Sequence, residues 1–392
     1  APLLFFSRRI GLNEGQPIPI LGGGRVTGRA GPYSVGLLNI QTDDGPTNTV
    51  KTTNFSVVRL KRDILDRSTV GVIATHRSKA LDGPGSNSVY GLDTRLAFFS
   101  NFFIDAYYAQ TQTQGRTGDE ASYRTRVENN GDRYGFVVEH LKVGKDFNPE
   151  VGFMRRENFR RNFGEVRFSP RHISSNVVRK YTLQASLEYT TSASTGALET
   201  REAIARFDLQ FENGERLRNH YSRQYEFLTE PFTIASGVVI PVGGYDFETV
   251  VSRYTIGQQR LISGSVGFQA GTFYGGKRSE VSFSGRMKLG TKFGIEPSWS
   301  VNFIDLPQGK FETNIGRLRA VVTMTPRMFV EALTQYSSNG DSVGTNVRYR
   351  WEYQPGSELF VVYNEQRDTL SHRFPEMENR AFIVKVTRLF RF

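Results

Sequence analysis

The side chains best suited to acid–base or metal chemistry in this sequence are its five histidines, and they are widely spaced. They are His76, His140, His172, His220 and His372. None has the H-E-x-x-H spacing that sets two imidazoles on one helical face for zinc. No G-x-S-x-G motif occurs to place a nucleophilic serine. A barrel enzyme, whose site would be assembled from distant strands, stays open as an alternative, but we predict no enzyme, no cofactor and no metal site.

Two short motifs could bind ions. The glycine run 22–24 could cradle a phosphate, but the G-K-[ST] ending of a phosphate loop is absent and no helix is expected after it. We therefore expect a flexible turn or a close backbone approach there. The acidic pair 43–44, followed by Gly45, could ligate calcium through its carboxylates, although solvated turn residues are the simpler interpretation.

The densest cluster of charge lies within residues 155–167. It consists of Arg155, Arg156, Glu157, Arg160, Arg161, Glu165 and Arg167. Guanidinium groups bind phosphate in a bidentate manner, so this cluster could contact lipopolysaccharide at an outer rim that follows the loop 145–152. The alternative, which we favour, is a rim whose charges are paired within the protein.

The composition indicates the class of protein in which these residues stand. The chain has 392 residues, a formal net charge of +11 and no cysteine, so disulfides and thiolate sites are excluded. Mean hydropathy is negative, and no stretch approaches the roughly 20 apolar residues that a membrane helix needs. The 17 Tyr, 30 Phe and 39 Gly suit a sheet in which only alternate residues face lipid. The basic residues are dispersed along the chain, so we do not expect nucleic acid as a partner.

The deciding signal is a period of two. In residues 181–190 the odd positions are Tyr181, Leu183, Ala185, Leu187 and Tyr189, and the even positions are all polar. The same alternation recurs in residues 203–212, 281–289, 317–324 and 347–353. Long alternating strands repeated over such a chain favour a transmembrane barrel over a soluble all-β sandwich. We predict an all-β fold, a closed antiparallel transmembrane β-barrel of about 22 strands, within 20–24.

The connections between strands differ in length. Tight turns are expected at Ser100–Asn101, Asn213–Gly214, Gly257–Gln258, Thr325–Pro326 and Pro355–Gly356. Looser connections are expected at Asp43–Thr49, Lys79–Asn87, Glu230–Gly244 and Leu370–Asn379. Short turns on one edge and longer loops on the other are typical of outer-membrane barrels. With an even number of strands, both chain ends would lie on the short-turn, periplasmic side.

Basic residues on the polar face of these strands are the candidates for a lumenal site. They are Arg206, Arg286, Lys288, Arg317, Arg319, Arg348 and Arg350. Cationic side chains in a pore favour anions. The alternative is that the acids Glu188, Asp208, Glu212 and Glu352 pair with them across strands and leave little net field.

The end of the chain continues the alternation. Counting back from Phe392, every second residue is Phe390, Arg388, Val386, Val384 and Phe382. A terminal Phe closing such a row resembles the signal that the barrel-assembly machinery recognises. Phe392 is therefore the predicted assembly signal, and that machinery is a predicted partner.

Several stretches resemble one family. They are LFFSRRIG at 4–11, ILGGGRVTGRAGPYSVGLLNIQT at 20–42, NFSVVRLKRDIL at 54–65, DFNPEVGFMRRENFRR at 146–161 and FIVKVTRLFRF at the end. Together they are similar to the barrel region of a large group of bacterial outer-membrane proteins that often carry an N-terminal module resembling carbohydrate-binding family 9. The resemblance implies a barrel without that module and brings no established activity.

These observations lead to one expectation of function and two alternatives. Residue 1 is Ala and no leader precedes it, so the segment is processed or is part of a longer chain. We expect residues 1–392 to be a single barrel domain, the C-terminal part of a longer protein. It would span a bacterial outer membrane as a porin-like channel for small solutes, saccharides among them. The alternatives are a structural or secretion-partner barrel whose lumen or rim binds another polypeptide or the absent N-terminal domain, and a barrel enzyme.

Overall fold

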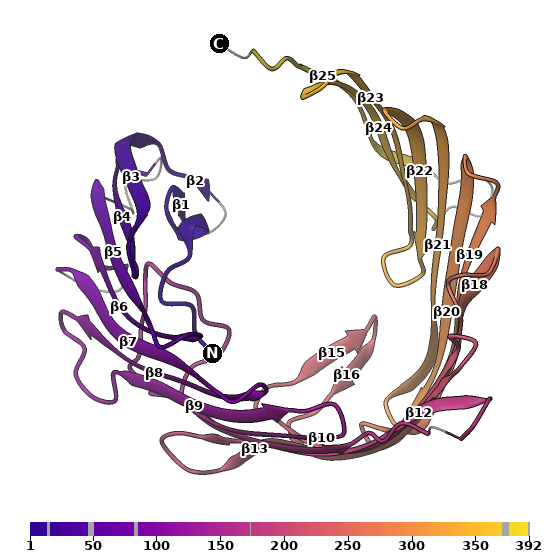
Figure 1. Ribbon diagram of the computed structural model, residues 1–392, viewed down its shortest axis with the longest axis horizontal. Coiled ribbons are helices and arrows are strands. Elements are labelled where there is room, and N and C mark those ends of the chain that lie inside the picture. The colour runs from indigo at the N-terminus through magenta and orange to yellow at the C-terminus, as the bar shows by residue number, and fades with distance from the viewer. Residues whose placement is uncertain (14–15, 46–50, 82–84, 173, 371–375, 391–392) are drawn as a thin grey trace. The chain divides into compact units, whose positions relative to one another are not determined.

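The computed structural model describes residues 1–13, 16–45, 51–81, 85–172, 174–370 and 376–390 (Figure 1). This part of the chain is all β, apart from one short 3-10 turn at Ser7–Arg9. None of its helical residues forms a segment long and apolar enough to cross a membrane. Both Phe392 and His372 lie outside the described residues.

The described residues contain one large antiparallel sheet of 21 strands, each bonded to its neighbour in chain order. The strands are β3 (Ile20–Ala30), β4 (Tyr33–Thr42), β5 (Thr53–Ile64), β6 (Ser68–Arg77), β7 (Asn87–Phe98), β8 (Phe102–Thr113), β9 (Ala121–Asn130), β10 (Tyr134–Val143), β11 (Phe159–Phe168), β12 (Val178–Ser192), β13 (Leu198–Phe211), β14 (Arg216–Leu228), β17 (Gly243–Ile256), β18 (Ile262–Phe273), β19 (Gly276–Leu289), β20 (Phe293–Leu306), β21 (Gly309–Thr325), β22 (Met328–Ser337), β23 (Ser342–Gln354), β24 (Ser357–Asp368) and β25 (Glu376–Thr387). Two hairpins stand apart: β1 (Leu12–Asn13) with β2 (Gln16–Pro17), and β15 (Phe232–Ala235) with β16 (Val238–Ile240).

The chain forms two compact units. Unit 1 comprises Ala1–Phe168 with Ala185–Ala203, and unit 2 comprises Ser169–Gln184 with Ile204–Phe392. The all-β prediction is confirmed, and 21 strands fall within the expected range of 20–24. Both chain ends were expected at the same edge because an even number of strands was expected. The described sheet has 21 strands, which is an odd number.

In unit 1 the period of two separates buried from exposed side chains. Along β10, Val138 is 58% exposed whereas Leu141 is 1% exposed, because successive side chains point to opposite faces. We call the face that carries Glu139, Leu141 and Val143 the covered face of unit 1, and the opposite one its open face. The open face presents the exposed apolar residues Leu92, Tyr108 and Val138.

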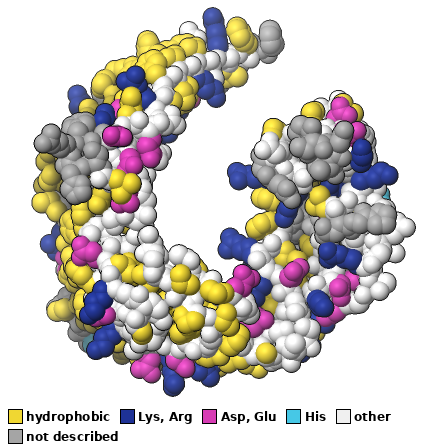
Figure 2. Space-filling view, turned by 180° about the vertical axis from the view of Figure 1, so that it is seen from behind, with side chains coloured by type: hydrophobic (Ala, Val, Ile, Leu, Met, Phe, Trp, Pro, Cys, Tyr) yellow, Lys and Arg dark blue, Asp and Glu magenta, His cyan; other side chains and the backbone are white. Residues whose placement is uncertain are grey.

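Unit 2 repeats the arrangement. In β20, Trp299 and Phe303 are exposed, whereas Ile304 and Leu306 on the other face are buried. We call the face that carries Glu296, Ile304 and Leu306 the covered face of unit 2. Hydrophobic side chains gather along the convex side of β22–β25, which is the open face there (Figure 2). The alternation predicted for residues 281–289, 317–324 and 347–353 is confirmed by the registers of β19, β21 and β23.

In each unit the strands end along two opposite edges of the sheet, and the connections at these two edges differ in length. In unit 1, the turns 31–32, 65–67, 99–101 and 131–133 share one edge, and the longer connections that follow β4, β6, β8 and β10 share the other. In unit 2 the contrast is weaker, because the loop edge also carries the short turns 274–275 and 307–308. Tyr274 and Gly275 both have positive φ, of 44° and 78°, as a two-residue hairpin turn of type I′ requires.

An N-terminal segment and one loop fold onto the covered face of unit 1 at its loop edge. Leu3 bridges Phe153 of the loop 144–158, and the Phe6 amide donates to the Val151 carbonyl at 2.9 Å. Leu4 packs against a buried cluster on β8, β10 and β11 that includes Leu141. Figure 1 shows this segment, with β1 and β2, on the concave side of β3–β8.

A hairpin covers the corresponding face of unit 2. Val238 and Ile240 of β16 are buried against Phe247 of β17 and against Ile304 and Leu306 of β20. Figure 1 shows β15 and β16 standing off the strands of unit 2 on their concave side. The sequence predicted only a loose loop here, because two short strands of three or four residues carry too little alternation to be recognised.

Two sequence expectations concern residues near the two ends of the chain. The glycine run 22–24 lies inside β3, where a Cβ on Gly23 would come 2.7 Å from the Asn39 carbonyl oxygen, so the expected close backbone approach is confirmed. The last strand ends at Thr387, so the alternating row in β25 comprises Phe382, Val384 and Val386 only. Phe390 lies beyond the strand, with the Arg388 guanidinium 5.2 Å from its ring.

Candidate functional site

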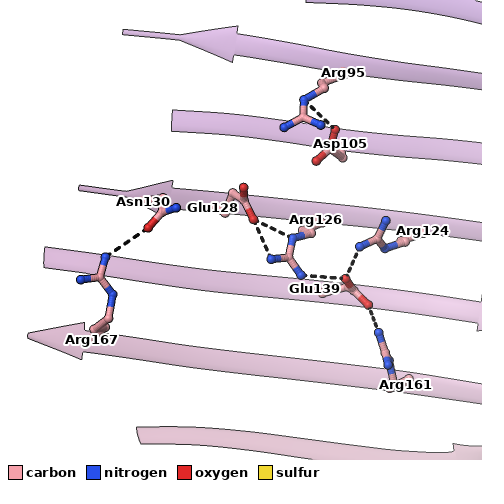
Figure 3. Close-up of polar contacts among 9 residues, drawn as sticks. All are labelled: Arg95, Asp105, Arg124, Arg126, Glu128, Asn130, Glu139, Arg161 and Arg167. Atoms are coloured by element: carbon pink, nitrogen blue, oxygen red, sulfur yellow. Dashed lines mark hydrogen bonds and ion pairs between the residues drawn. The ribbon is translucent and has the colours of Figure 1, made fainter. Parts of the chain in front are cut away.

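A buried carboxylate in unit 1 lies among charged residues from four strands. The Glu139 side chain is 1% exposed and lies on the covered face of β10 (Figure 3). Its Oε2 accepts from Arg124 at 2.5 Å and from Arg126 at 3.4 Å, and its Oε1 accepts from Arg161. Arg161 also pairs with Glu188 of β12 at 3.6 Å. We call these residues, with Glu128, the Glu139 network.

Register explains why these groups meet. Glu139 lies directly opposite Arg126 of β9 and Phe163 of β11, and Arg124 and Arg161 lie two positions further along on the same face. Arg126 is shared with Glu128, whose Oε2 lies 2.6 Å from it. Three guanidiniums thus face three carboxylates, so the buried charge of Glu139 is balanced within the network.

A second buried ion pair fastens the covering loop. Glu150, in the loop 144–158, lies 3.6 Å from Arg77 of β6, and both side chains are buried. The Glu150 carboxylate also accepts from the Leu81 amide at 2.8 Å, and the Asn87 side chain donates to the Asn148 carbonyl at 2.8 Å. The polar groups of this loop are therefore satisfied while it lies on the sheet.

In unit 2 the covered face carries a continuous row of alternating charge across β19–β23. Arg286 pairs with Glu296 at 3.2 Å, and Glu296 with Arg319 at 3.0 Å. Arg319 then pairs with Glu331 at 2.9 Å, and Glu331 with Arg348 at 2.8 Å. We call these five residues the charge ladder.

Next to the charge ladder, Arg350 pairs with Glu358 of β24 and lies near the rings of Phe329 and Phe360.

The structure brings four of the seven predicted lumenal residues together and leaves three outside these pairs. Arg286, Arg319 and Arg348 belong to the charge ladder, and Arg350 lies beside it. Arg206 bonds the neutral Gln184 at 3.3 Å. Lys288 and Arg317 form no ion pair within the described part of the chain. Seven basic groups less the three acids that pair with them, Glu296, Glu331 and Glu358, leave a net charge of +4, so pairing weakens the positive field without removing it.

The pairing acids are not those proposed from the sequence. Asp208 pairs with Arg218 at 3.3 Å, and Glu188 pairs with Arg161. The Glu212 amide donates to the Val177 carbonyl at 3.0 Å, and the Glu352 carboxylate accepts from the Gly356 amide at 3.0 Å. Glu139, Glu296, Glu331 and Glu358 were missed. Their polar-face spacing was visible in the sequence, but choosing a partner requires the register between strands, which the pattern within one strand does not give.

The basic cluster 155–167 does not form a single rim. β11 runs from the loop edge to the short-turn edge, so Arg167 reaches the turn 131–133 and donates to the Gly131 carbonyl at 2.6 Å. Arg156 pairs with Glu199, and Arg161 belongs to the Glu139 network. These contacts favour the interpretation that most of the cluster is paired within the protein.

The remaining sequence candidates take part in local contacts. Asp44 Oδ1 accepts from the Thr52 amide at 2.5 Å and the Thr52 hydroxyl at 2.8 Å, and these bonds hold the pKa of Asp44 below its usual value. His76 lies 2.9 Å from the Ser88 hydroxyl, and His140 lies 2.7 Å from the Asn162 side-chain oxygen. Among the described residues, no group of three or more His, Asp or Glu side chains could hold a metal ion.

Comparison with protein families and with curated proteins gives no match, so the site is interpreted on its own geometry.

Proposed function

We propose that this chain closes its sheet into a β-barrel that spans a bacterial outer membrane and serves as a channel for small polar solutes. The observation that carries the proposal is the division of each strand into two chemically different faces. The open faces present apolar and aromatic side chains such as Leu92, Val138 and Trp299 to the surroundings. The covered faces carry ion pairs. An apolar outside and a polar inside suit a wall between lipid and water.

The argument for closure is energetic. A sheet in lipid has no water to bond the free N–H and C=O groups of an edge strand, so each open edge would cost several kcal/mol per unsatisfied group. Barrels of about 16–22 strands enclose a lumen too wide for wall side chains to fill. The N-terminal segment, the loop 144–158 and the hairpin β15–β16 would narrow such a lumen from its loop edge.

We also propose that the chain is the barrel region of the family that its motifs resemble. Two of the motif stretches, 4–11 and 146–161, contact each other in unit 1: the Phe6 and Phe153 rings lie 5.5 Å apart. Two of the motif stretches that are far apart in the sequence thus belong to one packed part of the structure. The same proposal includes the barrel-assembly machinery, which would recognise Phe392, and outer-membrane lipid and lipopolysaccharide, which Arg160 on the open face of β11 would face.

The experiment is conductance of the purified protein in a planar lipid bilayer. We expect discrete, long-lived conductance steps, together with a gel mobility that changes on boiling, as folded barrels give. A protein that inserts but does not conduct, and that copurifies with another polypeptide, would favour the secretion-partner alternative. A protein that stays soluble without detergent would contradict membrane insertion itself.

A further inference from the structure

The covered face of unit 2 carries a second kind of polar surface, made of uncharged amides. Two cross-strand rows lie side by side on β22–β25. One row is Gln335, Gly344, Gln366 and Asn379, and the other is Leu333, Asn346, Asn364 and Ala381. The rows are two residues apart along the strands, or about 7 Å. We call Gln335, Asn346, Asn364, Gln366 and Asn379 the amide cluster.

A glycine opens a recess in the middle of this cluster. Gly344 stands between Gln335 and Gln366, and a Cβ built on it would have no atom within 4 Å. Gly344 lies in the lining of a hollow of about 200 Å³, together with the amide cluster, Leu333, Thr345 and Glu365. The backbone of Gly344 has no positive φ, so neither a turn nor strain requires glycine at this position.

The hydrogen-bonding groups around the recess are only partly used by the protein. The Asn346 amide donates to the Asn364 oxygen, and the Asn346 oxygen and the Asn364 NH₂ have no hydrogen-bond partner among the described residues, although both side chains line the recess. The Gln335 side chain has no hydrogen bond within the same part of the chain, whereas the Gln366 side chain donates to the Glu378 carboxylate at 2.9 Å. The one acid of the lining, Glu365, is paired with Arg367. The Glu378 carboxylate that touches the cluster is bonded to Gln366, and the groups left without a partner, on Gln335, Asn346 and Asn364, are neutral amides.

We infer that the amide cluster is a binding subsite for an uncharged, hydroxyl-rich solute of about the size of one sugar ring. An amide offers both donors and an acceptor, and a hydroxyl does the same, so the two match without any charge. Charged solutes would instead be held by the charge ladder, where guanidiniums and carboxylates compete for them. Apolar solutes find only Leu333 in the lining. This inference rests on the proposed channel function, because it deepens that function by naming a class of cargo.

The test uses glucose as the probe and measures its binding in two ways. Saturation-transfer NMR on the protein in detergent measures binding directly, and block of the single-channel current measures it during conduction. We expect Gly344→Val, which fills the recess, and Asn364→Ala, which removes one amide but leaves the space, each to weaken glucose binding about tenfold, as the loss of about one hydrogen bond would. Gly164→Val is the matched control, since a Cβ on Gly164 of β11 also meets no atom within 4 Å and lies on the open face of unit 1.

The outcomes separate the subsite from the channel. Absence of glucose binding to the unaltered protein, or equal binding by all variants, would overturn the inference, and preference for triglycine over glucose would overturn the assignment to hydroxyl-rich solutes. Binding that depends on Gly344 and Asn364 in a protein that does not conduct would leave the subsite standing and contradict the channel. Asn364→Ala keeps the test decisive if Gly344→Val does not fold.

Discussion

At the scale of single residues, Glu139 shows why a buried charge can be tolerated in this sheet. Removing a carboxylate from water is costly, and the attraction of neighbouring cations offsets that cost only when the geometry is good. Glu139 has three guanidiniums within 3.4 Å or less, from Arg124, Arg126 and Arg161. These contacts use most of the hydrogen-bonding capacity of the Glu139 carboxylate. The network therefore fixes the register of β9, β10 and β11 at one point.

Glu139→Gln should therefore destabilise the protein strongly. The amide keeps the shape of the carboxylate but leaves three half-buried guanidiniums without their shared counter-ion, and Arg126 and Arg161 retain Glu128 and Glu188, so the cost should be about 2–3 kcal/mol, below the value of about 3–5 kcal/mol for a fully buried pair. The free energy of unfolding, from a denaturant titration in detergent, measures the effect. The matched control is Glu188→Gln, which alters the same network at a side chain that is 36% exposed and should cost about 1 kcal/mol or less. Equal losses from the two variants would show that burial of Glu139 is not what matters.

A second residue, Tyr274, gives a prediction about pH. Burial, and then the hydrogen bond from its hydroxyl to Glu226 at 3.0 Å, raise the pKa of Tyr274 to about 12. Because the folded value lies above the ordinary value of about 10, this tyrosine stabilises the fold fully below about pH 10 and loses that contribution as the pH rises through 12. The difference in tyrosinate absorbance between the unaltered protein and Tyr274→Phe should titrate with a midpoint near 12. A midpoint near 10 would contradict the buried, bonded state of this hydroxyl.

At the scale of elements, the covered face of each unit is overlaid by inserted segments, and in unit 2 the inserted segment is held by apolar contact. The hairpin β15–β16 adds no strand to the large sheet, and its own hydrogen bonds are too few to keep it in place. Burial of Val238 and Ile240 against β17 and β20 supplies the attachment, at about 1.5–3 kcal/mol for a fully buried side chain.

Ile240→Ala should release this hairpin while the sheet stays folded. Ile240 is completely buried, so the truncation should cost about 2–5 kcal/mol of attachment. Limited proteolysis should then cut within 229–242 much faster than in the unaltered protein. The control is Val239→Ala, since Val239 lies on the opposite side of the same short strand and is 45% exposed. Equal protection of the two variants would mean that contacts other than this cluster hold the hairpin.

At the scale of the whole molecule, the net charge of +4 on the seven predicted residues and their three acids bears on selectivity. If the barrel conducts, we expect a modest preference for anions that grows at low salt, where screening is weak. The double variant Lys288→Ser with Arg317→Ser removes two unpaired charges and should reduce the preference. Arg350→Ser with Glu358→Ser removes one charge of each sign from the same face, so it should change the preference little. Reversal potentials across a salt gradient measure both, and a cation preference in the unaltered protein would contradict the expectation.

Closure itself can be tested by cross-linking. The sheet has 21 strands, each antiparallel to the next, so the first strand, β3, and the last, β25, run in the same direction. Direct closure would therefore pair them in parallel. Val26→Cys in β3 should form a disulfide with one of Phe382→Cys, Val384→Cys or Val386→Cys, all on the open face, and the change should appear as a non-reducing gel shift. The chain has no native cysteine to interfere.

The control for this experiment is a pair already known to be adjacent. Val361 of β24 lies directly opposite Val384 of β25, so Val361→Cys with Val384→Cys tests whether a disulfide can form at that depth of the sheet. If this pair cross-links and no pair between β3 and β25 does, the sheet does not close through these two strands.

The all-β class, the division of strands into two faces and the difference between the edges follow from local sequence patterns. Side-chain direction alternates strictly along an extended chain, so Leu183, Leu187 and Tyr189 could be assigned to one face before any partner strand was known. The tight turns at Asn213–Gly214 and Pro355–Gly356 were equally local, because their residues favour turn conformations on their own.

Which charges meet, and which segments cover the polar face, depend on the tertiary arrangement of the strands. Arg319 could be assigned to the polar face from its own strand, but its contacts with Glu296 and Glu331 depend on the registers of β20 and β22 against β21. Contact between Leu4 and the Leu141 cluster joins segments more than a hundred residues apart, and no short-range pattern encodes it. The alternation of side chains is set within one strand, whereas ion pairs between strands and the covering of a face depend on several segments. The site therefore became visible only when the strands were placed side by side.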